Sequence, residues 1–204
     1  DEFAQPHLVE LCLMYNRIER IEKLEKLENL QKLNLRANRI REIRGLSCCR
    51  ALQELELYEN QLQRVQGLEG LSCLKLLDLS FNRIERIEGF EHAGLCSLRE
   101  LYLASNLIGE IEGLEGLPAL KLLELGSNKI RAIRNLQAVR MLSELHLGRN
   151  KISRLEGLEG FTELHVLGLA SNRLRALDGV EQLLELRELY ADHNGIESMA
   201  QLAP

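Results

Sequence analysis

The sequence predicts a repeat protein of the α/β class: a right-handed solenoid with one parallel, concave β-sheet and short helical or 3₁₀ turns on its convex side. Asparagines recur in register at intervals of 22 residues, with one interval of 24. Leucine supplies 46 of the 204 residues and tryptophan none, which favours a repetitive core. The nine asparagines in register are Asn16, Asn38, Asn60, Asn82, Asn106, Asn128, Asn150, Asn172 and Asn194.

Each asparagine closes the pattern L-x-x-L-x-L-x-x-N, as in residues 120–128. In each L-x-L the two leucines point one way and the residue between them points the other way, as a short strand requires. A single repeat buries too few apolar side chains to offset the entropy of ordering its backbone, so neighbouring repeats must stack. We expect the asparagines to bond backbone groups inside the turns and to form a ladder along one rim.

The segment after each asparagine continues x-I-x-x-I-x-x-L, usually with a glycine before the next apolar anchor, as at Gly67 and Gly113. This span is too short for a long helix and predicts single turns or 3₁₀ segments on the convex side. The 24-residue interval belongs to the coil that spans 74–97. Its two extra residues, within 90–95, are expected to bulge on the convex side.

The whole chain, 1–204, is expected to be one domain of nine 22-residue repeats, one of them extended to 24. Its end at Leu202–Pro204 carries no polar capping sequence, which solenoids need to cover the terminal core. We therefore expect a piece of a longer array that lacks its C-terminal cap.

Composition excludes several classes of protein. The net charge is −5, and no run of about 18 uncharged apolar residues occurs, so we expect no membrane-spanning segment. The five cysteines are an odd number without a C-x-x-C pair, which favours reduced thiols in the cytosol or nucleus.

Three rows of side chains are predicted to line the concave face: the residues just before, between and just after the last two leucines of each strand pattern. The middle row is Cys12, Asn34, Glu56, Asp78, Tyr102, Glu124, His146, Gly168 and Tyr190. Across the three rows nine acidic residues face only Lys32 and Arg36, so this face is more negative than the whole chain. An acidic face attracts a basic partner and repels nucleic acid.

Aromatic side chains gather on the same face, since Tyr58, Tyr102 and Tyr190 lie in these rows and Phe81 lies one residue beyond. Tyrosine is enriched in interface hot spots. The alternative is that acids and tyrosines are here only solvated strand residues. A basic position follows most of the asparagines, as at Arg17 and Lys129, but alone it is weak evidence for nucleic-acid binding.

No phosphate loop, dinucleotide fingerprint, zinc spacing or nucleophile elbow occurs in the sequence. The strongest catalytic or metal-binding candidate is Glu124 beside His146, with Asp78 and Tyr102 in the same row. Strands lie about 4.8 Å apart, so the Glu124 and His146 side chains are close enough to touch. An open, solvated wall excludes no water, so we expect neither an enzyme nor a bound cofactor or metal.

The motif resembles the leucine-rich-repeat family. Segments 55–61, 77–82, 123–133 and 186–197 also match the leucine-rich-repeat regulatory subunits of protein phosphatase 1 at positions outside the consensus. That resemblance implies a non-catalytic regulatory subunit, in nucleus and cytoplasm, whose concave face binds the type 1 serine/threonine phosphatase catalytic subunit, with a further inhibitor protein as a second partner. It places contacts at Asp78, Tyr102, Glu124 and His146, where His146 replaces an aromatic residue of the family.

We therefore predict a monomeric scaffold that binds protein, and neither nucleic acid nor membrane. The alternative is a general interaction module for a cytoskeletal, ciliary or spliceosomal partner. The predicted partner-binding residues are Glu56, Tyr58, Asp78, Phe81, Tyr102, Glu124, His146 and Tyr190.

Overall fold

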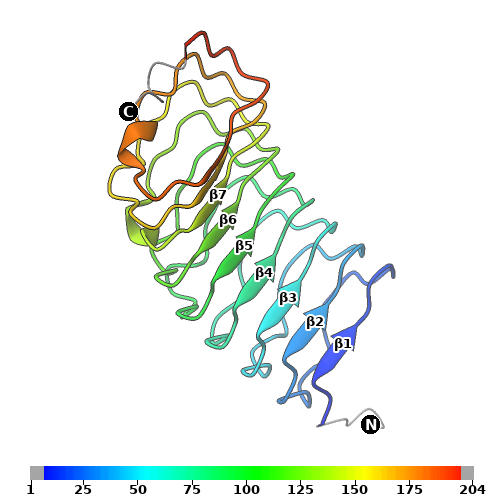
Figure 1. Ribbon diagram of the computed structural model, residues 1–204. Coiled ribbons are helices and arrows are strands. Elements are labelled where there is room, and N and C mark those ends of the chain that lie inside the picture. Colours follow the sequence, from blue (N-terminus) through cyan, green and yellow to red (C-terminus); the bar gives the residue numbers. More distant parts are fainter. Residues whose placement is uncertain (1–6, 199–204) are drawn as a thin grey trace.

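The computed structural model describes residues 7–198, which form a solenoid with nine strands in one sheet. The coils stack in chain order from the blue to the red end, with the strands in one row and the loops opposite (Figure 1). Each strand pairs in parallel with the next, which confirms the predicted repeat solenoid. The strands are β1 (Glu10–Cys12), β2 (Lys32–Asn34), β3 (Glu54–Glu56), β4 (Leu76–Asp78), β5 (Glu100–Tyr102), β6 (Leu122–Glu124), β7 (Glu144–His146), β8 (Val166–Gly168) and β9 (Glu188–Tyr190).

Each strand is only three residues long because the period-two pattern is short. From β3 to β7 the central leucine is buried and its two neighbours are half-exposed. The leucine that follows the strand, such as Leu57, is also fully buried. The leucines of all coils therefore build one continuous core behind the sheet, and the residues between them form its outer face.

Eight of the asparagines, from Asn38 to Asn194, make a repeated set of hydrogen bonds. Asn128 donates from Nδ2 to the Leu125 carbonyl of its own turn (3.1 Å) and to the Leu103 carbonyl of the preceding coil (2.9 Å). Its Oδ1 accepts from the Ile108 amide, also of the preceding coil, at 3.0 Å. The predicted asparagine ladder is confirmed, and it also joins each coil to the one before it.

The convex side consists of turns and two 3₁₀ helices, η1 (Gln137–Val139) and η2 (Val180–Gln182), as predicted. Glycine is required where the backbone of one coil passes close to that of the preceding coil. Gly67 has φ +69°, and a Cβ there would collide with the Ile43 carbonyl. In the sixth coil Asn135 takes this place at φ 60°, and its Nδ2 donates to the Ile111 carbonyl at 2.9 Å.

The two extra residues of the 24-residue repeat lie on the convex side, as expected. Glu91 and His92 are exposed there, while Phe90 and Ala93 are buried in the core. The strand register is unaffected, since Leu77 still pairs with Leu101. Phe90 takes the core position that Leu68 and Leu114 hold in neighbouring coils, so the longer loop adds only Ala93 to the core and does not disturb the sheet.

No helix within residues 7–198 is long and apolar enough to cross a bilayer. The expected uncapped end at Leu202–Pro204 lies outside the described residues.

The asparagine ladder predicts that two Asn→Ala substitutions, one inside the ladder and one at its end, differ in their effect on stability. Asn128→Ala leaves the buried Ile108 amide without its partner and removes one of the two asparagine donors to each of the Leu103 and Leu125 carbonyls, so it should lower the free energy of unfolding by about 3 kcal/mol. Asn16 is exposed and donates only to the Leu13 and Met14 carbonyls of its own turn, so Asn16→Ala should cost about 1 kcal/mol. Urea unfolding followed by circular dichroism measures both. Equal losses would show that the bonds between coils contribute nothing.

Candidate partner-binding surface

The middle row of the concave face is continuous. Strand pairing sets Asp78 beside Tyr102, and Tyr102 beside Glu124. Glu124 in turn pairs with His146, and Gly168 separates His146 from Tyr190. The structure thus brings these predicted site residues together on one face, with Glu56 next to Asp78 at the N-terminal side.

Tyr58 and Phe81 lie where the strands run into the asparagine rim. Their ring centroids are 4.7 Å apart, and Phe81 is 48% exposed. Phe81 adopts a left-handed backbone conformation, with φ 55°, which carries its side chain out of the rows.

Sequence reasoning missed that conformation, which is shared by the residue before every repeated asparagine. The sequence feature that could have predicted it is that this residue always stands at the turn after the strand, directly before the asparagine, where a left-handed conformation reverses the chain. The residues concerned are Tyr15, Ala37, Glu59, Phe81, Ser105, Ser127, Arg149, Ser171 and His193.

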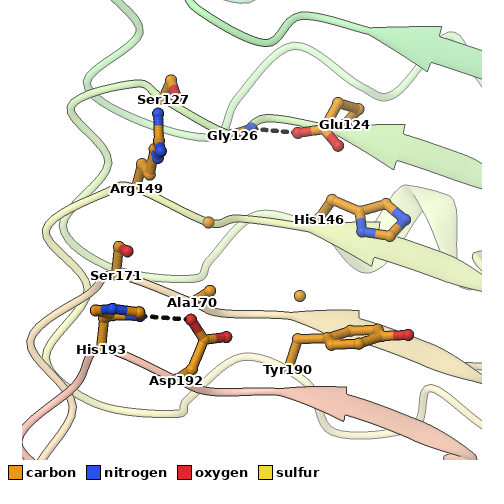
Figure 2. Close-up of a pocket in the computed structure, with 12 residues that line it drawn as sticks. Glu124, Gly126, Ser127, His146, Arg149, Ala170, Ser171, Tyr190, Asp192 and His193 are labelled. Atoms are coloured by element: carbon orange, nitrogen blue, oxygen red, sulfur yellow. Dashed lines mark hydrogen bonds and ion pairs between the residues drawn. The ribbon is translucent and has the colours of Figure 1, made fainter.

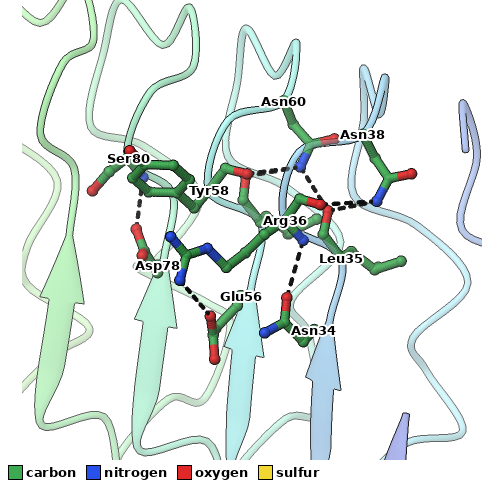
Figure 3. Close-up of polar contacts among 10 residues, drawn as sticks. Asn34, Leu35, Arg36, Asn38, Glu56, Tyr58, Asn60, Asp78 and Ser80 are labelled. Carbon is green, nitrogen blue, oxygen red and sulfur yellow. Dashed lines mark hydrogen bonds and ion pairs between the residues drawn. The ribbon is translucent and has the colours of Figure 1, made fainter. Parts of the chain in front are cut away.

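At the N-terminal end of the concave face, the acidic side chains have basic partners. Lys32 Nζ lies 2.7 Å from Glu54 Oε1. Arg36 reaches across to Glu56, with Nη1 3.7 Å from Oε2, and its guanidinium carbon lies 4.4 Å from the centre of the Tyr58 ring (Figure 3). Burial raises the pKa of Glu56, and Arg36 opposes that rise. This end is close to neutral.

From β4 to β9 the three rows contain no lysine or arginine within the described part of the chain. Their six carboxylates belong to Asp78, Glu100, Glu124, Glu144, Glu188 and Asp192. The negative charge predicted for the whole face is therefore concentrated on its C-terminal two-thirds. The rows read from the sequence indicate both the sign and the place of this charge, and the contacts of Lys32 and Arg36 show that the acids of β3 are also neutralised.

The carboxylates of this acidic part are held in place by local hydrogen bonds. Asp78 Oδ1 accepts from the Ser80 amide at 2.9 Å, and Glu124 Oε1 accepts from the Gly126 amide at 2.6 Å. The Tyr102 hydroxyl donates to Glu100 Oε2 at 2.9 Å. Burial, together with this bond to a carboxylate, raises the pKa of the Tyr102 hydroxyl. The ring and the acids are therefore pre-positioned.

A second tyrosine repeats this arrangement at the C-terminal end of the face. The Tyr190 hydroxyl donates to Glu188 Oε2 at 2.6 Å, and this bond raises the pKa of the hydroxyl. Tyr190 is 51% exposed, so much of its ring is open to a partner.

An open hollow of about 660 Å³ lies at the C-terminal ends of β6 to β9. Glu124, His146 and Tyr190 stand on its strand side, and small residues form much of its floor (Figure 2). The floor residues are Gly126, Gly148, Gly168 and Ala170. A partner can approach the backbone closely here because no large side chain intervenes.

Glu124 and His146 are neighbours, as the strand spacing indicates, but within residues 7–198 they share no hydrogen bond or ion pair. Within residues 7–198 the polar contact of the His146 ring is with its own strand, where Nε2 lies 3.5 Å from Glu144 Oε2. Glu124 instead folds back onto the Gly126 amide. Burial raises the pKa of Glu124, while the bond from Gly126 and the nearby His146 oppose the rise. The described residues hold no group of three side chains suited to a metal ion.

Comparison with known proteins identifies a family that agrees with the solenoid fold. A family model described as leucine-rich repeats, in two copies, matches residues 6–48, 50–92 and 96–138. No curated protein matches the chain.

Several solved structures are similar to this chain. Internalin C2 of Listeria monocytogenes is 30% identical, with a TM-score of 0.80, over 89% of this chain and 80% of that one. The functional domain of InlJ from the same organism, at 22% identity and TM-score 0.76, shares the fold; the match covers 94% of this chain and 41% of that domain. TLR13, solved in complex with the RNA ssRNA13, is 30% identical, with a TM-score of 0.78, over 87% of this chain and 27% of that one.

The half-buried carboxylate in the hollow predicts a pH-dependent gain in stability. Glu124→Gln keeps an oxygen that accepts from the Gly126 amide but removes a desolvated charge, so it should raise the free energy of unfolding near pH 7 by about 1 kcal/mol. Because the pKa of Glu124 is raised in the folded state, its ionisation lowers stability as the pH rises above the unfolded pKa, and this loss is complete above the folded pKa; the gain from Glu124→Gln should therefore vanish as the pH falls below both values.

Urea unfolding near neutral pH and about pH 3 measures this gain. The control is Glu159→Gln at an exposed convex position, expected to change the free energy by less than about 0.5 kcal/mol at either pH. A loss of stability from Glu124→Gln at neutral pH would contradict this account of the site.

Proposed function

Because the chain belongs to the leucine-rich-repeat family, we propose that it is a non-catalytic scaffold that binds a protein partner on its concave face. Solenoids of this kind present an extended curved surface in place of an enclosed pocket. The hollow over β6 to β9 is open, and the Glu124 carboxylate in it is already bonded to the Gly126 amide of its own coil. These features favour surface recognition over chemistry.

The observation that carries the proposal is the acidic, tyrosine-bearing surface on β4 to β9. Six carboxylates there have no lysine or arginine in the same rows, whereas both acids of β3 are paired, Glu54 with Lys32 and Glu56 with Arg36. An uncompensated field of this kind speeds the encounter with a basic patch on a partner. Tyr102 and Tyr190 add ring surface whose hydroxyls are oriented, which suits them as hot-spot residues.

The finer proposal is that the partner is the catalytic subunit of protein phosphatase 1. Its support is the resemblance of segments 55–61, 77–82, 123–133 and 186–197 to protein phosphatase 1 regulatory subunit 7. On this proposal Asp78, Tyr102 and Glu124 contact the phosphatase, and the protein acts in nucleus and cytoplasm. His146 would contact the phosphatase where the family has an aromatic residue.

Two alternatives have different partners. A general interaction module would use the same face for a cytoskeletal, ciliary or spliceosomal protein. RNA binding is the second alternative, because the structurally similar TLR13 was solved in complex with ssRNA13. The carboxylates of β4 to β9 disfavour it on the concave face, because phosphate groups are repelled there.

Replacing the central residues of the face tests the proposal. Tyr102→Ala or Glu124→Ala should weaken binding to the phosphatase catalytic subunit by about 1–2 kcal/mol or more, since each removes a pre-positioned group. Isothermal titration calorimetry measures the affinity, and circular dichroism checks that the solenoid stays folded. The matched control is Tyr15→Ala, a tyrosine on the rim of the first coil that is 76% exposed and should leave affinity unchanged.

The outcomes distinguish the general proposal, a scaffold that binds protein on its concave face, from the finer proposal that the partner is the phosphatase. Unchanged affinity in both concave variants would reject the concave face as the binding site. If the phosphatase does not bind, an affinity pull-down with the wild-type chain identifies the dominant partner. If a different partner is captured and its capture depends on Tyr102, the scaffold proposal stands and the phosphatase is rejected as the partner.

A further inference from the structure

A second charged surface, opposite in sign, lies beyond the asparagine rim of coils six to eight, the coils that begin with β6, β7 and β8. We name it the basic flank. It consists of Lys129, Arg131, Arg149, Lys151, Arg154, Arg173 and Arg175. All but the half-exposed Lys151 are exposed. The buried Ile130 and Ile152 alternate with them and hold the backbone against the core.

Backbone hydrogen bonds fix these residues in register from coil to coil. The Lys151 amide donates to the Ile130 carbonyl of the preceding coil at 2.8 Å, and the Arg173 amide donates to the Ile152 carbonyl at 2.8 Å. Lys129, Lys151 and Arg173 therefore occupy equivalent places one coil apart. Figure 2 shows Arg149 at the turn after β7, at the edge between the hollow and this flank.

The positive charge of the basic flank is not neutralised by ion pairs, and it ends at the fifth coil. None of its seven side chains makes an ion pair within the described part of the chain. The acids on the same stretch of these coils are Glu156 and Asp178. The fifth coil presents Glu110 and Glu112 at this place, paired with Arg134 and Arg86, so the row of unpaired cations ends at the sixth coil.

We propose that the basic flank binds an acidic polypeptide segment, a run of aspartate or glutamate residues in a second protein. Coils lie about 4.8 Å apart, so three coils span about 10 Å, the length of three or four extended residues. Five of its seven cations are arginines, whose planar guanidinium groups bind carboxylates in bidentate pairs. Ser127 and Ser171 stand in register with Arg149 and add hydroxyl donors.

Nucleic acid fits the basic flank less well. Single strands are bound by stacking bases on aromatic rings, and the flank consists of lysine and arginine side chains with serines between them. A duplex is too broad, since its major groove alone is about 12 Å wide, and it would extend over Glu110 and Glu112. A short acidic peptide can stay within the three basic coils.

The basic flank and the acidic concave surface lie on opposite sides of the asparagine rim. The chain can therefore hold a basic partner in its concave face and an acidic segment on its flank at the same time. This inference does not depend on the identity of the concave partner.

Charge reversal tests the proposal in the full 204-residue chain. The probe is a fluorescein-labelled octaglutamate peptide, and fluorescence anisotropy gives its Kd at low and at physiological salt. Lys129→Glu with Arg173→Glu should raise the Kd at least about tenfold, because two attractions become repulsions at short range. The matched control is Arg39→Glu with Arg83→Glu, which changes the net charge equally at the same repeat position in coils two and four and should raise the Kd less than about twofold.

Two further measurements keep the proposal testable. If the reversed variant loses its circular-dichroism signal, Arg131→Gln with Arg175→Gln replaces it, and a weaker but clear rise in Kd is expected. Tyr102→Ala should bind the peptide normally, which separates this site from the concave face.

The proposal is overturned if the peptide does not bind, or if both double reversals weaken it equally. It is also overturned if a labelled oligothymidylate or a short duplex binds the flank more tightly than the peptide does, since the site would then serve nucleic acid.

Discussion

The stacking of each coil on the one before it is the constraint on which the rest of the structure depends. Eight asparagines carry it, and each completes a turn in its own coil while bonding a carbonyl and an amide of the preceding coil, as Asn82 does with Leu57 and Leu62. Buried backbone groups must find partners, and here many of the partners lie one repeat away. The leucine core and the close glycine crossings, as at Gly67, depend on the same contact between coils.

The functional surfaces follow from that constraint. Because the register is fixed, a residue at a given repeat position always meets the equivalent residue of the next coil, and charges accumulate in rows. Strand positions from β4 to β9 carry the acidic row, and positions beyond the rim in coils six to eight carry the basic row. The chain separates opposite charges across one rim while its net charge is only −5.

The sequence predicted the coils, the strand register, the rows of the concave face and the convex bulge, because each is a direct consequence of periodicity. It did not predict contacts that depend on side-chain reach. Arg36 pairs with Glu56 and stacks on Tyr58, which neutralises one end of the face, and Glu124 turns to the Gly126 amide and away from His146. The left-handed residue before each asparagine was also missed, since none of these residues is glycine and they share no single side-chain type.

The most direct test of the coil-stacking account is native-state hydrogen exchange at the amide of Ile108, which donates to Asn128 Oδ1. The reference is the amide of Leu103, which donates to the Glu124 carbonyl in the sheet at 2.8 Å. If the asparagines join the coils, both amides exchange only through the same cooperative opening and show equal protection. If Ile108 exchanges as fast as an exposed convex residue such as Glu159 while Leu103 stays protected, the asparagine ladder does not hold the coils together, and the account is wrong.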